Sequence, residues 1–205
     1  TLPLNANESP GVQPTATVYD FGSKDQSWKI SLSSNFFALV TNKYKSWEDF
    51  IEYSKKTIQY VLDDYEPALF TRVGLRYRSV IDRSALGLST VPWSELISPN
   101  IAGFLKDVGG YEEEQKSLLE FESVIQFGID GGKVTLRHGL VMNSETKDIG
   151  YLIDADYFSE NEREATLNAG VSALENFHGF AWRVFRWCIQ DSLHDAMGPQ
   201  KIPEA

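Results

Sequence analysis

Cysteine is almost absent from this chain, because Cys188 is the only one among 205 residues. A single thiol cannot close an intrachain disulfide or supply a structural zinc site, so packing must stabilise the fold. The composition fits a reducing compartment, and no apolar run is long enough to span a bilayer. We therefore expect a cytoplasmic protein with no membrane partner.

Basic residues are also scarce. The chain has 19 Lys and Arg against 29 Asp and Glu, which gives a formal net charge of -10. Binding to a phosphate backbone draws on a surplus of cations that release counterions, and anionic membranes attract basic segments in a similar way. General nucleic-acid binding is therefore disfavoured, whereas a local group of arginines that holds one small anion is compatible with the composition.

Common catalytic motifs are missing as well, including the G-x-S-x-G nucleophile elbow and the dinucleotide fingerprint. Cys188 lies in a strongly apolar helical pattern, which is typical of an inert core thiol. His138 shares its strand face with apolar residues, so we expect it to be buried and hydrogen-bonded. His178 and His194 lie too far apart on one predicted helix to bind zinc together. The sequence predicts no catalytic residue and no cofactor.

The clearest positive feature is a stretch of alternating side chains at residues 70–81, which is typical of a strand packed on one face only. The apolar face is formed by Val73, Leu75, Tyr77 and Ile81, and the other face by Arg72, Arg76 and Arg78. Three arginines on one side of a strand need anionic partners. Those partners are either carboxylates of the same chain or a ligand.

The periodicity along the rest of the chain predicts an α+β fold, with an antiparallel or mixed sheet of about six strands covered by two long helices. Ser46 and Asp49 form a capping box for the first helix, and Ser159 with Glu162 form one for a last helix from about 162 to 197. The link Asp130-Gly131-Gly132 fits a hairpin turn. Strands are expected at residues 15–21, 28–32 with a kinked extension at 36–40, 70–81, 117–129, 133–142 and 149–157.

We expect one domain at residues 15–198, preceded by an extended lead-in at 1–14 and followed by a tail at 199–205. Both Trp28 and Tyr151 begin a pattern of strand, aromatic corner and capped helix. This pattern indicates two pseudo-repeat halves, at residues 15–110 and 111–198.

Two interpretations of the arginine strand remain open. In the first, Arg72, Arg76 and Arg78 pair across strands with carboxylates such as Asp154 and Asp156, with Glu120 and Glu122 on the same outer face. In the second, the guanidinium groups bind a phosphate or carboxylate ligand. The two aspartates could instead hold Mg²⁺ or Mn²⁺, because they project from one side of their strand and these ions favour oxygen ligands.

The aromatic content of 13% is a surplus that indicates either a thick core or an apolar contact surface. In the last helix, two tryptophans flank the polar stripe that carries two of the arginines. These residue types dominate the energetics of protein interfaces. The predicted partner-binding residues are Trp182, Arg183, Arg186 and Trp187.

The run from Arg72 to Tyr77, with the pattern R-x-G-L-R-Y, resembles the signature strand of a sporadically distributed bacterial family of uncharacterised proteins. Trp47 and Phe50 match the W-x-x-F helix start of that family, and residues 152–157 resemble its later strand. Ser79 departs from the amide side chain expected there. The resemblance implies a missing N-terminal segment and an accessory gene of the toxin–antitoxin or phage-defence kind.

These features favour a non-enzymatic binding or interaction protein of the bacterial cytoplasm, with a protein partner or homo-oligomer. The first alternative is a sensor of an anionic small molecule that uses Arg72, Arg76 and Arg78. The second is a metal-dependent hydrolase that uses Asp154 and Asp156.

Overall fold

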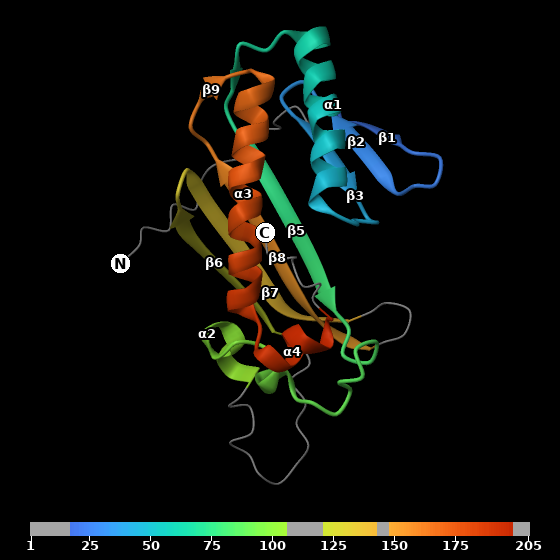
Figure 1. The fold of residues 1–205 in the computed structure, drawn as a ribbon, viewed down its shortest axis with the longest axis vertical. Helices are drawn as coiled ribbons and strands as arrows, with labels where there is room; N and C mark the ends of the chain where they lie inside the picture. Colours follow the sequence, from blue (N-terminus) through green and yellow to red (C-terminus); the bar gives the residue numbers. More distant parts are fainter. Residues whose placement is uncertain (1–16, 106–120, 143–147, 199–205) are drawn as a thin grey trace, which may run out of the picture. The chain divides into compact units, whose positions relative to one another are not determined.

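The computed structural model describes residues 17–105, 121–142 and 148–198. The fold is α+β, and its described strands pair antiparallel in sheets of three, two and four strands (Figure 1). A single sheet of about six strands is not among them. The chain divides into two compact units, Thr1–Tyr60 and Val61–Ala205.

The first unit contains a three-stranded meander of β1 (Tyr19–Gly22), β2 (Trp28–Leu32) and β3 (Phe37–Thr41). Residues 37–41 pair alongside β2 as a separate strand, so the predicted kinked extension is corrected. The β1–β2 turn is held by Asp25, which accepts hydrogen bonds from the hydroxyls of Ser27 and Ser23 at 2.7 and 2.8 Å. These hydrogen bonds lower the pKa of Asp25 well below its usual range.

Helix α1 (Trp47–Tyr65) begins where the capping box predicted. Ser46 Oγ accepts the backbone N–H of Asp49 at 3.2 Å, and this satisfies one of the free donors of the first turn. The ring of Tyr53 lies 4.4 Å from that of Trp28, so the helix packs on the start of β2. Pro67 follows the helix end and prevents its continuation.

The second unit is built on a four-stranded sheet in the order β5-β8-β7-β6. A separate two-stranded ribbon is formed by β4 (Leu69–Phe70), which precedes β5 in the sequence, and β9 (Arg163–Glu164), which follows β8. Gly131 has a φ of 77° in the β6–β7 hairpin, as its predicted turn requires. The strands of the large sheet are β5 (Val73–Ile81), β6 (Glu122–Ile129), β7 (Gly132–Met142) and β8 (Ile149–Ser159).

Helix α3 (Leu167–Cys188) packs on β5 and β8 (Figure 1) and makes one face of the sheet the core. Tyr77 Oη on β5 lies 2.9 Å from His178 Nδ1 on α3. Short helices close one end of this core: η1 (Trp93–Glu95), α2 (Pro99–Ala102), η2 (Gly103–Leu105) and α4 (Asp191–Ala196). The fully buried side chains include Leu96, Ile97, Val134, Leu136, Tyr151, Tyr157, Phe177, Cys188 and Leu193.

The prediction for the last helix was wrong at its start and in its continuity, whereas the helical pattern does end before Gly198 as α4. Ser159 ends β8 and does not cap the helix; Thr166 does, because its Oγ1 accepts the N–H of Ala169 at 3.2 Å. The helix stops at Cys188 because Ile189 forms a β-bridge with Ile97, and residues after Gln190 start α4. The helical periodicity of the sequence continues through residues 189 and 190, but the pairing of Ile189 with Ile97 interrupts the helix there.

The lead-in at 1–14, the tail at 199–205 and Glu120 lie outside the described residues. No helix in the described part of the chain is long and apolar enough to cross a membrane. The internal duplication stays a prediction.

Candidate functional site

The arginines of β5 lie on the face of the sheet that points away from α3. Leu75 and Ile81 are buried on the inner face, whereas Arg76 and Arg78 are exposed. The predicted two faces are therefore confirmed for Val73–Ile81, whereas the predicted start at residue 70 is wrong, because Phe70 belongs to β4 and Arg72 precedes β5. The outer face is an open sheet surface on which charged side chains from β5, β7 and β8 meet.

Asp154 on β8 lies at the centre of this face. The register places it opposite Arg78 on β5 and opposite Arg137 on β7. Asp154 is only 3% exposed, so its carboxylate needs hydrogen-bond donors from the protein. Arg76 supplies them: its Nε donates to one carboxylate oxygen at 2.7 Å, and its Nη2 donates to the other. Hydrogen bonding to this carboxylate raises the pKa of Arg76.

Arg72 completes a second ion pair at the neighbouring position. Its Nη2 donates to Asp156 at 2.9 Å, and its guanidinium lies over the Phe158 ring at 4.7 Å. Gly74 makes this possible, because a Cβ there would lie 3.0 Å from Arg72 Nη1. The pairing around Gly74 is regular, so this glycine leaves room for a side chain and does not mark a bulge.

The first interpretation of the arginine strand is thus correct for Arg72 and Arg76, which neutralise Asp156 and Asp154. It does not account for Arg78. Within the described part of the chain, Arg78 and Arg137 are exposed and form no hydrogen bond or ion pair. They are separated by the width of β8, or about 10 Å between backbones at the usual strand spacing.

Arg137 was not predicted as a site residue. The alternation of Val134, Leu136 and His138 as an apolar set places Arg137 on the wet face. The sequence alone could therefore have assigned its face. Its place across Asp154 from Arg78 depends on the register between β7 and β8, which the sequence does not reveal.

The two aspartates proposed as metal ligands serve ion pairs in this structure. Asp154 and Asp156 are bound by arginine, and Glu122 lies on β6, opposite Gly139 and two strands away from β8. Among the residues described, no group of three or more His, Cys, Asp or Glu is placed to hold a metal ion. The metal site stays a prediction with no geometric support.

The predicted partner residues lie on α3 and have unequal environments. Trp182 is 62% exposed, and Trp187 is 42% exposed, with its ring centroid 6.3 Å from that of Phe127 in an edge-to-face arrangement. Arg186 is engaged locally, because it donates to the carbonyl of Ile189 at 3.0 Å and pairs with Asp191. Arg183 stacks on the Phe180 ring at 4.5 Å. Trp182 and Arg183 are therefore the most available of the four.

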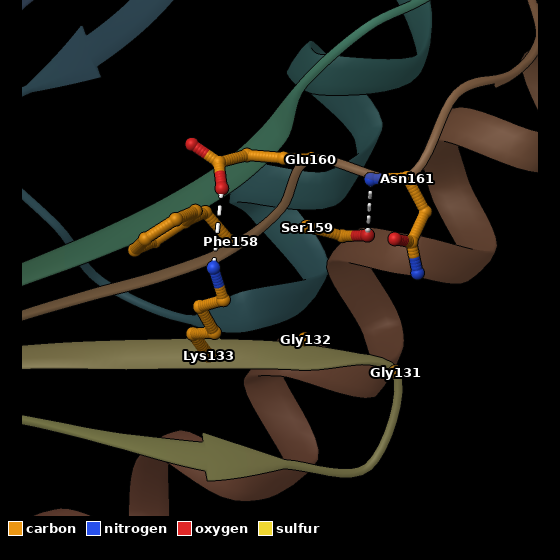
Figure 2. Close-up of a pocket in the computed structure, with 7 residues that line it drawn as sticks. All are labelled: Gly131, Gly132, Lys133, Phe158, Ser159, Glu160 and Asn161. Carbon is orange, nitrogen blue, oxygen red and sulfur yellow. Dashed lines mark hydrogen bonds and ion pairs between the residues drawn. The ribbon is translucent and has the colours of Figure 1, made fainter.

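A shallow polar hollow of about 280 Å³ lies where β8 ends beside the β6–β7 turn (Figure 2). Figure 2 shows Lys133 paired with Glu160 and the N–H of Asn161 donating to Ser159 Oγ, at 3.3 Å in each case. Ser159 Oγ also accepts from Arg163 at 2.9 Å. Lys133, Ser159 and Glu160 already have partners there, so the hollow is a weaker site than the arginine face.

The remaining reactive side chains belong to the core. His138 is 2% exposed, and its Nδ1 lies 2.8 Å from the hydroxyl of Tyr151. Burial lowers the pKa of His138 and raises the pKa of the Cys188 thiol to about 12. The predictions of a buried, hydrogen-bonded histidine and of a core position for Cys188 are confirmed, and the inertness of the thiol stays a prediction.

Comparison of the chain with known proteins finds no homologue that could assign a role to this site. No protein-family model, no curated protein and no solved structure matches the chain. The family resemblance of the arginine strand stays a prediction, and the function is inferred from the residues of the site.

Proposed function

We propose that this protein is a non-enzymatic binding protein that holds an anionic small molecule between Arg78 and Arg137. One observation carries the proposal: within the described residues, both guanidinium groups are exposed, flank one buried carboxylate and lack any anionic partner. The proposal changes the predicted ligand set, because Arg72 and Arg76 act as supports and Arg137 joins Arg78.

The charge balance of the face explains why an external anion would bind. Arg76 neutralises Asp154, so the positive charges of Arg78 and Arg137 remain uncompensated. A guanidinium matches a phosphate or carboxylate through two parallel hydrogen bonds, and two such groups give orientation as well as charge. The surrounding chain carries a net charge of -10, which disfavours long polyanions and leaves small oxyanions.

The test is a thermal-shift and calorimetric screen at low ionic strength, where exposed charges are least screened. The probes are inorganic phosphate, pyrophosphate, citrate, nucleotides and sugar phosphates. We expect at least one to raise the Tm of the wild type, because a ligand that binds only the folded state stabilises it. Arg78→Ala and Arg137→Ala each weaken that shift, and the double variant abolishes it.

Matched variants make the result specific to geometry. Arg183→Ala removes one exposed arginine from α3 and leaves the shift intact. Arg78→Lys retains the positive charge but lacks the planar guanidinium, so its affinity for the anion lies between that of Arg78→Ala and that of the wild type. No response to any probe, or an unchanged response in the double variant, contradicts the proposal. Arg76→Ala is a poor test because it also strips the partner from a buried carboxylate.

The exposure of Trp182 and Trp187 favours a second function, contact with a protein partner through α3. This is the interaction role that the sequence predicts, and the two functions use opposite faces of the same sheet. A place in a bacterial accessory or defence system is part of that proposal and is supported only by the resemblance of the arginine strand.

A further inference from the structure

The exposed stripe of α3 has an arrangement that would match a second copy of itself. Glu175, Gly179 and Arg183 are spaced four residues apart, so they form one continuous row along the helix surface. All three are exposed. The row has an acid at one end, a base at the other, and a glycine at its midpoint.

Nothing among the described residues requires a glycine at position 179. A glycine in the middle of a helix is destabilising relative to alanine. A Cβ at position 179 would meet no atom within 4 Å, so no packing contact in the described structure requires its absence. The notch that it leaves in the exposed stripe suits close approach of another backbone.

The charged residues beside the notch are available. Glu175 forms no hydrogen bond or ion pair with any described residue. Arg183 donates its Nε to the carbonyl of Gly179 at 3.2 Å and stacks on Phe180 at 4.5 Å, which holds the guanidinium next to the notch with its terminal nitrogens free for a partner. Trp182, 62% exposed, lies on the other side of the same stripe.

We propose that α3 forms the contact of a homodimer whose twofold axis passes beside Gly179. An antiparallel copy of the row then sets Glu175 next to the partner's Arg183, and Arg183 next to the partner's Glu175. Packing along rows of residues four apart is the commonest arrangement of helix pairs in globular proteins. The same axis places Trp182 on the same flank of the contact as the partner's Trp182, so one surface supplies both halves of a self-complementary interface.

The contact goes beyond anion binding, and it lies on the other side of the sheet from Arg78 and Arg137. It rests on the second proposed function, contact through α3, and names a second copy as the partner, so its failure leaves the anion site untouched. One helix pair buries a small area, so we expect a weak dimer, with a monomer–dimer equilibrium visible at concentrations up to about 500 µM.

Sedimentation velocity of the full chain tests this with a charge swap. Glu175→Arg and Arg183→Glu each place like charges across the axis, so each weakens dimerisation at least tenfold. The double variant Glu175→Arg/Arg183→Glu reverses the row but keeps it self-complementary, and it restores the dimer. A monomeric wild type at the highest concentration, or a double variant as weak as the single ones, overturns the proposal.

Two further variants locate the axis. Gly179→Ala raises the Tm of the monomer but weakens the dimer, because the new methyl fills the notch. Gly179→Cys crosslinks under mild oxidation, since a disulfide needs Cα atoms within about 7 Å. Asn168→Cys, placed about 33 Å from its mate in this arrangement, does not crosslink. Equal crosslinking of both cysteine variants contradicts an axis at Gly179.

Discussion

Replacement of Arg76 by methionine tests whether this arginine has a structural role that Arg78 lacks. The change keeps an unbranched side chain and removes both donors to Asp154, which is 3% exposed. Loss of one partner from a fully buried ion pair costs about 3–5 kcal/mol of folding stability. Two features of the site reduce that cost here.

The first feature is solvent, because the Arg76 side chain is 54% exposed and its interaction is partly screened. The second is rescue, because Arg78 and Arg137 flank the same carboxylate and can turn towards it. We therefore expect Arg76→Met to lower the free energy of unfolding by about 2 kcal/mol. At this chain length the corresponding decrease in Tm is roughly 4–8 °C.

Urea denaturation and thermal unfolding of Arg76→Met, Arg78→Met and Arg137→Met give the comparison. The latter two variants change stability by less than about 0.5 kcal/mol, as substitutions at unpaired surface residues usually do. Adding Arg78→Met to Arg76→Met removes part of the rescue, so the double variant loses more than the sum of the two. If Arg76→Met and Arg78→Met are equally stable, the division of roles on this face is wrong.

Three other predictions concern the core of the second unit. Thr166→Ala removes the cap of α3 and lowers stability by about 1 kcal/mol, whereas Ser172→Ala on the exposed stripe changes it little; equal effects by denaturation would contradict the cap. Burial lowers the pKa of His138, so as pH decreases the unfolded chain takes up this proton before the folded one does. The free energy of unfolding therefore falls below about pH 6.5, by at most about 1.4 kcal/mol per pH unit. His138→Gln flattens that slope, and an unchanged slope would refute the assignment. Cys188, with a pKa raised to about 12, reacts with a thiol reagent only as fast as the protein opens; rapid labelling of the native state would show it to be accessible.

The local features of the fold were predictable from sequence because each is set by neighbouring residues. Ser46 caps α1 through the N–H of Asp49, three residues away, and β5 shows its two faces through simple alternation. The residues of β2 were also correct as predicted, since the alternation from Trp28 to Leu32 is bounded by turn residues.

The remaining features depend on contacts distant in sequence. The break after Cys188 arises from the pairing of Ile189 with Ile97, and no local signal marks it. The separation of the strands into three sheets depends on which strands pair, and periodicity does not contain that information. For the same reason the sequence predicts that the arginine strand is charged on one face, but it does not distinguish the roles of Arg76 and Arg78. That distinction requires the register that places Asp154 between Arg78 and Arg137.

The most direct measurement is an NMR titration of the arginine side-chain Nε–Hε signals with pyrophosphate, or with whichever probe gives the largest thermal shift. We predict that the signals of Arg78 and Arg137 move in saturable fashion while those of Arg72 and Arg76, held by Asp156 and Asp154, stay in place. Binding that leaves Arg78 and Arg137 unmoved would contradict the proposed site.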